Sequence, residues 1–271
     1  MQHTSALSTA AAETYTAHST AGPAVQSNEV YPTPCTTVPS IRIAAASDKR
    51  YSLGSTGNVR RTRMTLLYLI RHGENIDGKV GGVGPTVDLG LSELGRSQVE
   101  RLCRRLAASD SIKPTTLLAS TERRAAETAQ LLGVALGLGV TPNRDLEEWR
   151  SDDGNIEPEE FMAQWRNVKE RERAFHRFQP KSETQAEFFA RVGTVLNCIS
   201  KEHDGGSIAL VTHGGFIQAS FRHFFGFGDA AFRRAYPAAA HTSISHWRAE
   251  AGSDRWVLEF TNDARHIECA A

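Results

Sequence analysis

The chain has 271 residues, and its 31 lysines and arginines balance its 31 aspartates and glutamates. This length allows one medium-sized domain with a sizeable core, with or without a tail, and the balanced charge gives no sign of a nucleic-acid partner. The apolar run Leu66 to Ile70 is far shorter than the roughly 20 residues of a membrane span, so we expect no membrane association. The four cysteines form no C-x-x-C pair, which excludes a zinc knuckle and a dithiol motif and suits reduced thiols in the cytoplasm.

Residues 1–63 are rich in Ser, Thr, Ala and Pro and have neither a helical nor a strand period. This composition predicts a disordered, low-complexity leader before a folded domain at 64–271. Three origins stay open. An acid-poor, Ser-rich leader suits an organelle transit peptide, although its first forty residues contain no arginine. Alternatively, the leader is a dispensable tail, or Met64 is the true start.

From Met64 onward, strands alternate with amphipathic helices, a pattern that predicts βαβ units and a largely parallel sheet. A buried strand at Leu66–Ile70 precedes a Gly-rich loop, and Ser92 is placed to cap the next helix. The next elements are a strand at Thr116–Ala119 and a helix at "ERRAAETAQLL", followed by an insertion from Glu148 to about Lys181 that is helical around Phe161–Phe178. A further helix carries Phe188, Val192, Val195, Leu196 and Ile199, and it precedes a strand at Ile208–Thr212 and a helix from about Phe216 to Phe224. The chain closes with antiparallel strands at Ser243–Trp247 and Trp256–Phe260, joined near Gly252.

Two of these strands end in a histidine followed by glycine. The first runs into Arg71-His72-Gly73, the other runs into His213-Gly214-Gly215, and a third leads to Arg123 and Arg124. The carboxyl ends of parallel strands meet at one edge of a sheet, so we expect both histidines, Arg71 and one of Arg123 and Arg124 to converge there. Fixed cations stabilise a transferring phosphoryl group, and a neutral imidazole can attack phosphorus. The pattern therefore indicates phosphoryl transfer without a metal or a cofactor.

Four segments, "RHGE", "STERRAAETA", "LEE" and "THGG", occur in an order that resembles the histidine phosphatase superfamily, also called phosphoglycerate-mutase-like. The resemblance spans Met64 to roughly Phe260. It implies an α/β fold, a three-layer αβα sandwich with a mostly parallel central sheet.

The resemblance also implies roles for individual residues. His72 is the phosphorylated nucleophile and Glu148 the proton donor and acceptor. The phosphoryl group is bound by Arg71, Arg124, His213 and the Gly214 amide.

The chain departs from the family pattern at four places, one of which is "SET" at 182–184, where Gly-Glu-Ser is common. Thr121-Glu122 replaces the usual Pro-Leu and puts a negative charge near the pocket mouth. After the "LEE" segment the usual G-x-W-E-G register is absent, which leaves Glu147 as an alternative to Glu148. His241 stands where many members have a small polar residue, and we name it with Asn75 and Trp149 as a candidate for contact with the substrate.

These observations predict metal-independent hydrolysis of a small phosphomonoester through a phosphohistidine on His72. One alternative is phosphoglycerate mutase-type transfer, against which Ile76-Asp77-Gly78 departs from the mutase pattern. The other is a phospho-ligand-binding protein without turnover, which the intact His72, Arg124 and His213 disfavour. The identity of the phosphomonoester and the oligomeric state are left open.

Overall fold

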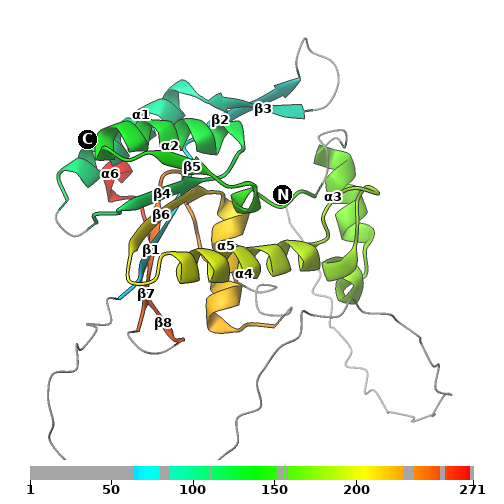
Figure 1. Cartoon of the computed structure of the whole chain (residues 1–271). Helices are drawn as coiled ribbons and strands as arrows, with labels where there is room; N and C mark the ends of the chain where they lie inside the picture. The colour runs from blue at the N-terminus through cyan, green and yellow to red at the C-terminus, as the bar shows by residue number, and fades with distance from the viewer. Residues whose placement is uncertain are drawn as a thin grey trace, which may run out of the picture. The chain divides into compact units, whose positions relative to one another are not determined.

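A six-stranded sheet organises the folded part of the chain (Figure 1). The computed structural model describes residues 64–79, 86–109, 112–151, 156, 158–228, 235–250 and 254–268, so the predicted leader at 1–63 lies outside the described residues. The strand order is β5-β4-β6-β1-β7-β8. The first four strands pair in parallel, and β7 and β8 pair antiparallel at one edge.

The strands are β1 (Leu66–Arg71), β4 (Thr116–Ala119), β5 (Val140–Pro142), β6 (Ser207–Thr212), β7 (Ile244–Ala249) and β8 (Trp256–Asp263). β1 lies in the middle of the sheet, and its Leu67–Ile70 are at most 1% exposed. A strand covered on both faces needs a continuous apolar run, which is why it stands out in the sequence. The predicted strands are confirmed within one to three residues at each end, whereas β5 was not predicted.

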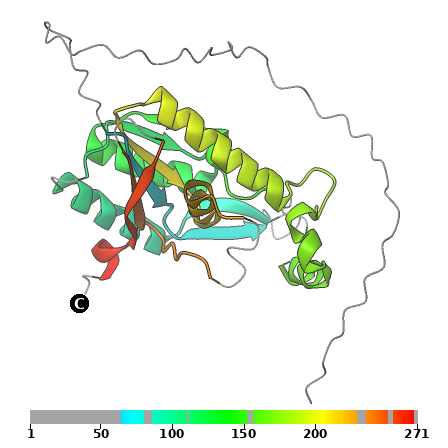
Figure 2. The same cartoon turned by 90° about the horizontal axis from the view of Figure 1, so that it is seen from below.

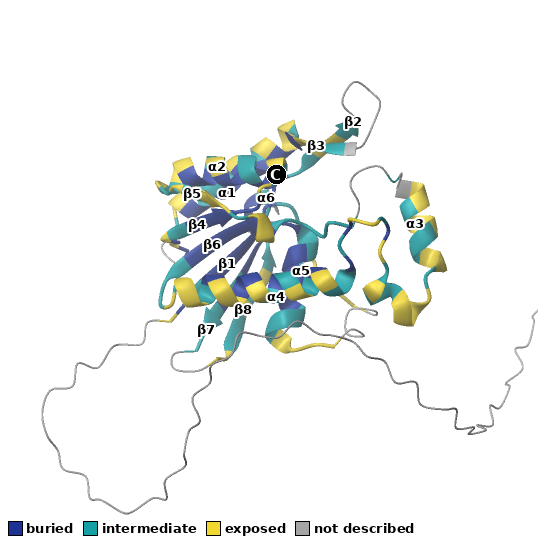
Figure 3. Cartoon of the chain, turned by 45° about the vertical axis from the view of Figure 1, so that its right-hand side comes forward, coloured by how far each residue is buried: buried dark blue, intermediate teal, exposed yellow. Residues whose placement is uncertain are grey.

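Helices cover both faces of the sheet, as the three-layer prediction requires. α1 (Glu93–Ala107) and α2 (Arg123–Leu136) lie on one face, and the short α6 (Arg265–Glu268) packs against α1 (Figure 1). α4 (Gln185–Glu202) and α5 (Gly214–Phe225) cover the other face. Buried residues line the sheet and the inner sides of the helices (Figure 3), so the sheet separates two apolar cores. No helix among the described residues is long and apolar enough to cross a membrane.

Two regions differ from the sequence-based prediction. The Gly-rich segment after β1 contains an antiparallel hairpin, β2 (Asn75–Lys79) and β3 (Thr86–Leu91), where only a loop was expected. The insertion is helical as predicted, but its helical residues form two elements, α3 (Pro158–Asn167) and the 3-10 helix η3 (Glu170–Phe175), which end before Phe178. In both views α3 and η3 lie beyond the end of α4 (Figures 1 and 2). Stacking of Phe161 and Trp165 on Phe178 holds this insertion together.

Hydrogen bonds at the start of α1 tie the helix to the loop after β1. The predicted cap is confirmed, because Ser92 Oγ accepts from the Gly95 amide at 2.9 Å. The same hydroxyl donates to Glu74 Oε1 at 2.9 Å, and the Glu74 amide donates to Gln98 Oε1 at 2.9 Å. A Cβ on Gly95 would lie 1.9 Å from the Glu74 carbonyl oxygen, so this contact requires glycine.

We expect the Gly95→Ala variant to have a lower Tm than the wild-type protein. Replacing a glycine within a helix by alanine ordinarily stabilises the helix by about 1 kcal/mol. Here the added Cβ would clash with the Glu74 backbone, at a cost of roughly 1–3 kcal/mol or more, because neither α1 nor the loop after β1 can move freely. Thermal unfolding followed by circular dichroism measures the change. Gly139→Ala is the matched control, because a Cβ there meets nothing within 4 Å. An unchanged or higher Tm for Gly95→Ala would contradict the packing described here.

Candidate active site

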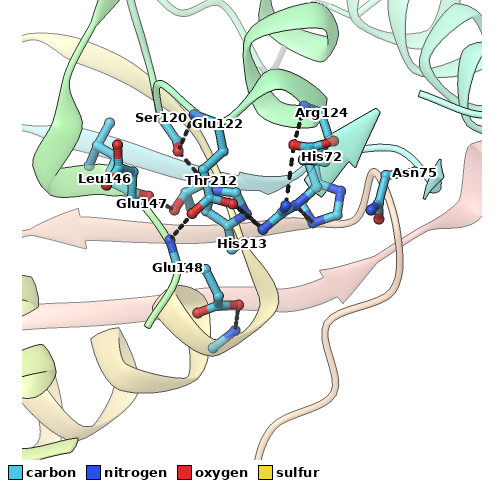
Figure 4. Close-up of polar contacts among 12 residues, drawn as sticks. His72, Asn75, Ser120, Glu122, Arg124, Leu146, Glu147, Glu148, Thr212 and His213 are labelled. Atoms are coloured by element: carbon cyan, nitrogen blue, oxygen red, sulfur yellow. Dashed lines mark hydrogen bonds and ion pairs between the residues drawn. The ribbon is translucent and has the colours of Figure 1, made fainter. Parts of the chain in front are cut away.

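His72 is the first residue after β1 and is 4% exposed. Its Nδ1 lies 2.7 Å from the Gly73 carbonyl oxygen. Because a carbonyl only accepts, Nδ1 carries the proton and Nε2 keeps its lone pair. That lone pair accepts a hydrogen bond of 3.2 Å from Nε of Arg124 (Figure 4).

The surroundings of His72 keep its imidazole neutral. Burial, together with the positive charges of Arg124 and Arg71, lowers the pKa of His72 to about 3, against the opposing effect of the hydrogen bond to Gly73. A neutral imidazole with one fixed tautomer has the form that a nucleophile needs.

His213 occupies the equivalent position after β6 and is fully buried. Because β1 and β6 pair with Arg71 opposite Thr212, the two histidines follow adjacent strands at the same level. Their ring centroids are 5.1 Å apart. His213 Nδ1 lies 3.1 Å from Arg124 Nη2, and Nε2 lies 2.7 Å from Ser120 Oγ. Since a guanidinium only donates, Nδ1 of His213 accepts and Nε2 carries the proton.

Arg124 joins the two histidines. It lies in the first turn of α2, and Asp88 on β3 accepts from both its backbone amide at 2.8 Å and its Nη1 at 3.2 Å. The neighbouring Arg123 points outward, is 60% exposed and pairs with Glu127. Arg124 is therefore the arginine that meets the histidines. Asp88 was not predicted, because it lies 36 residues away in the unpredicted hairpin.

Arg71 and Glu148 lie on the side of the cluster toward α5. Arg71 Nη1 donates to the Ala239 carbonyl at 2.6 Å, and its buried Nε has no hydrogen-bond partner among the described residues. Burial lowers the pKa of Arg71, whereas the nearby Glu148 raises it. Glu148 accepts from the Gly215 amide at 2.8 Å, in the first turn of α5. A Cβ on Gly215 would lie 2.4 Å from Glu148 Oε1, so the carboxylate needs glycine here.

The structure separates Glu147 from Glu148, the two acids between which the sequence left a choice. Glu147 accepts from Arg150 Nε at 2.8 Å and from the Thr121 hydroxyl, away from the histidines. Its pKa is lowered by these hydrogen bonds, against the effect of burial. Glu148 is the acid that interacts with Arg71.

Glu122 lies deeper than the pocket-mouth position that we expected. Its Oε2 pairs with Arg124 Nη2 and lies 3.7 Å from His213 Nδ1, while its Oε1 accepts from the Glu148 amide at 2.9 Å. Burial raises the pKa of Glu122, and the charge of Arg124 opposes that shift. The sequence identified Glu122 as an acid near the pocket, but it did not show that this side chain contacts Arg124 and approaches His213.

The three candidates for substrate contact have different surroundings. The His241 ring centroid is 5.6 Å from that of His72. The Asn75 side chain on β2 donates to Asp77 at 2.7 Å. Trp149 donates from Nε1 to the Glu183 carbonyl at 2.9 Å and lines a cavity beside Glu148.

That cavity has a volume of about 410 Å³. Glu148 is the one charged side chain among its described lining residues, which are Glu148, Trp149, Ser151, Gln185, Phe188, Phe189, Gly215, Gln218, Ala219 and Tyr236. No group of three or more His, Cys, Asp or Glu in the described part of the chain is arranged to hold a metal ion.

Comparison with known proteins agrees with this geometry. The family model of the histidine phosphatase superfamily (branch 1) matches residues 67–264. The chain belongs to the histidine phosphatase superfamily. Phosphoglycerate mutase-like protein 4 of Arabidopsis thaliana is 28% identical over 221 residues, 74% of this chain and 86% of that protein. A metal-independent phosphoserine phosphatase of the same plant is 23% identical, over 76% of this chain and 84% of its own. The native structure of a mycobacterial glucosyl-3-phosphoglycerate phosphatase matches with a TM-score of 0.59 at 25% identity, covering 74% of this chain and all of that one.

The buried, neutral His72 predicts a pH dependence of stability. Between the ordinary His pKa of 6.5 and its value of about 3 here, the unfolded chain binds a proton at this position that the folded chain does not. Stability must therefore fall as the pH falls through this window. We expect His72→Asn to lose less unfolding free energy than the wild type between pH 6.5 and pH 4.5, measured by urea titration. Parallel losses in the two proteins would show that His72 titrates normally.

Proposed function

We propose that the protein hydrolyses phosphomonoesters through a phosphohistidine on His72. The observation that carries this proposal is the neutral His72 imidazole, whose unprotonated Nε2 faces the guanidinium of Arg124. A nucleophile, fixed cations and a nearby carboxyl group are the parts that metal-free phosphoryl transfer needs.

Each group has a part in the proposed reaction. His72 Nε2 attacks phosphorus and the ester P–O bond breaks, while Glu148 protonates the leaving alkoxide. Water then attacks the phosphohistidine, Glu148 takes its proton, and the N–P bond breaks to release inorganic phosphate. Arg71, Arg124 and His213, with the Gly214 amide at the start of α5, bind the phosphoryl oxygens throughout.

The cavity beside Glu148 favours a phosphatase with a neutral leaving group. A leaving group that Glu148 protonates has to lie next to that carboxyl, where the described lining is aromatic and amide-bearing. A carboxylate-bearing group such as glycerate would meet Glu148 itself and no cation of the described lining. Burying an unpaired charge is costly, so this lining argues against a phosphoglycerate mutase.

The proposal is tested by phosphate release from a panel of phosphomonoesters in the presence of chelator, with wild-type protein and His72→Ala. We expect release by the wild type, no release by His72→Ala, and an acid-labile phosphoenzyme only in the wild type. His223→Ala is the matched control and should keep the wild-type rate, because His223 bonds Asn197 on the outer side of the fold.

Other outcomes of the same experiment would overturn the proposal. Interconversion of 3-phosphoglycerate without net release would identify a mutase. Phosphate binding without any turnover would identify a binding protein, and release that requires a metal ion would contradict the mechanism.

The separation of the two acids gives a sharper test of proton transfer. We expect Glu148→Gln to lower kcat on alkyl phosphates by roughly 10²–10⁴-fold, because their leaving oxygen needs a proton. With p-nitrophenyl phosphate, whose leaving group needs none, this variant should release a burst of about one nitrophenol per enzyme and then slow, since the attacking water lacks its base. Stopped-flow absorbance measures the burst. Glu147→Gln should behave like the wild type, and the reverse pattern would assign the role to Glu147.

A further inference from the structure

The acid Glu122 contacts Arg124, one of the groups that are proposed to bind the phosphoryl group. Arg124 donates from Nε to His72, from Nη1 to Asp88 and from Nη2 to Nδ1 of His213. Glu122 Oε2 pairs with that Nη2 and lies 3.7 Å from His213 Nδ1 (Figure 4). A carboxylate therefore sits against the atoms that would bind a transferring phosphoryl group.

The two contacts of Glu122 differ in what they do. Oε1 accepts from the Glu148 backbone amide at 2.9 Å, which fixes the side chain beside the proton donor. Oε2 places a negative charge against the guanidinium of Arg124. Both side chains are largely shielded from water, at 24% exposed for Glu122 and 16% for Arg124. The first contact needs only an oxygen acceptor, whereas the second depends on the charge. A Glu-to-Gln change separates them, because the amide oxygen can still accept.

We propose that the Glu122 carboxylate is an internal anion that holds the phosphoryl position in the ligand-free protein and competes with phosphate for Arg124. This inference rests on the phosphate-binding role proposed for Arg124. A phosphoryl dianion binds by displacing the carboxylate, and the carboxylate returns when inorganic phosphate leaves. Glu122 thus weakens the binding of substrate and product without taking part in bond making.

The competition depends on the ionisation of Glu122. Burial raises its pKa, the facing Arg124 lowers it, and the neighbouring Glu148 and Glu147 raise it again. His213, the remaining titratable group against it, stays neutral because burial and Arg124 hold its pKa well below the usual value. As the pH falls, Glu122 takes up a proton and its attraction to Arg124 weakens. The effect of removing the charge should therefore shrink toward acid pH.

Calorimetric titration with inorganic phosphate tests the inference directly. We expect Glu122→Gln to bind phosphate roughly fivefold more tightly than the wild type at pH 7.5, a change that corresponds to one partly buried ion pair. The ratio should decrease as the pH is lowered from 7.5 toward 5, because the raised pKa of Glu122 lets it take up a proton in this direction. At each pH both proteins are exposed to the same mixture of phosphate ionisation states. The ratio of their affinities therefore does not depend on the titration of phosphate itself. A structural defect would weaken binding, so a gain of affinity distinguishes competition from damage.

Glu127→Gln is the matched control. It removes the same charge one turn along α2, where Glu127 pairs with the outward Arg123 and Arg96. Its phosphate affinity should equal that of the wild type. Equal or weaker binding by Glu122→Gln, an equal gain in Glu127→Gln, or no binding by wild type and Glu122→Gln alike would overturn the inference.

This test is independent of turnover. If the wild type hydrolyses no phosphomonoester but Glu122→Gln binds phosphate more tightly, the proposed hydrolysis falls and the competition stands. If hydrolysis requires His72 but Glu122→Gln gains no affinity, the hydrolysis stands and the competition falls.

Discussion

The parallel pairing of β1 with β6 is the constraint on which the site depends. With Arg71 opposite Thr212, the next residue of each strand is a histidine, and the two imidazoles are side by side without any loop having to place them. The paired strands are buried on both faces, so neither histidine can shift without disturbing the centre of the molecule. A change of register by one residue would put the two rings at different levels and exchange the side chains of β1 between the two cores, whose packing they would not fit.

Two elements outside the sheet then hold charged groups at this edge. The hairpin supplies Asp88, which holds the guanidinium of Arg124 through Nη1 and the first turn of α2 through its amide. The first turn of α5 holds Glu148 through the Gly215 amide. Backbone amides at a helix start favour a negative charge. The cations and the acid are therefore fixed by groups outside the sheet, while the histidines are fixed by the sheet.

The sequence could predict the parts that depend on local pattern. The apolar run of β1, the Ser92 cap and the histidines at strand ends each follow from a few adjacent residues. The hairpin could not be predicted, because its short strands are polar and Gly-rich and are stabilised by their mutual pairing and by contacts with the distant α2. The roles of Asp88 and Glu122 were missed for a related reason. Asp88 lies in the unpredicted hairpin, and Glu122 stands only two residues before Arg124, so the sequence does not show that either side chain reaches this guanidinium.

The acids around Arg124 differ in how easily a ligand can replace them. Asp88 accepts from both the guanidinium and a helix amide, and it lies on the side away from the histidines, so a phosphoryl group need not displace it. Glu122 meets Nη2 between the histidines, where an incoming anion has to bind. Asp88 already pairs with Arg124 in the ligand-free site, and Glu122 adds a charged partner for the Nη2 that otherwise meets the neutral His213. A phosphoryl dianion has more charge and more acceptor oxygens than one carboxylate, so a substrate can still displace Glu122 from Arg124. Under the proposed mechanism, the same exchange limits how tightly inorganic phosphate is held, which suits an enzyme that has to release it in each cycle.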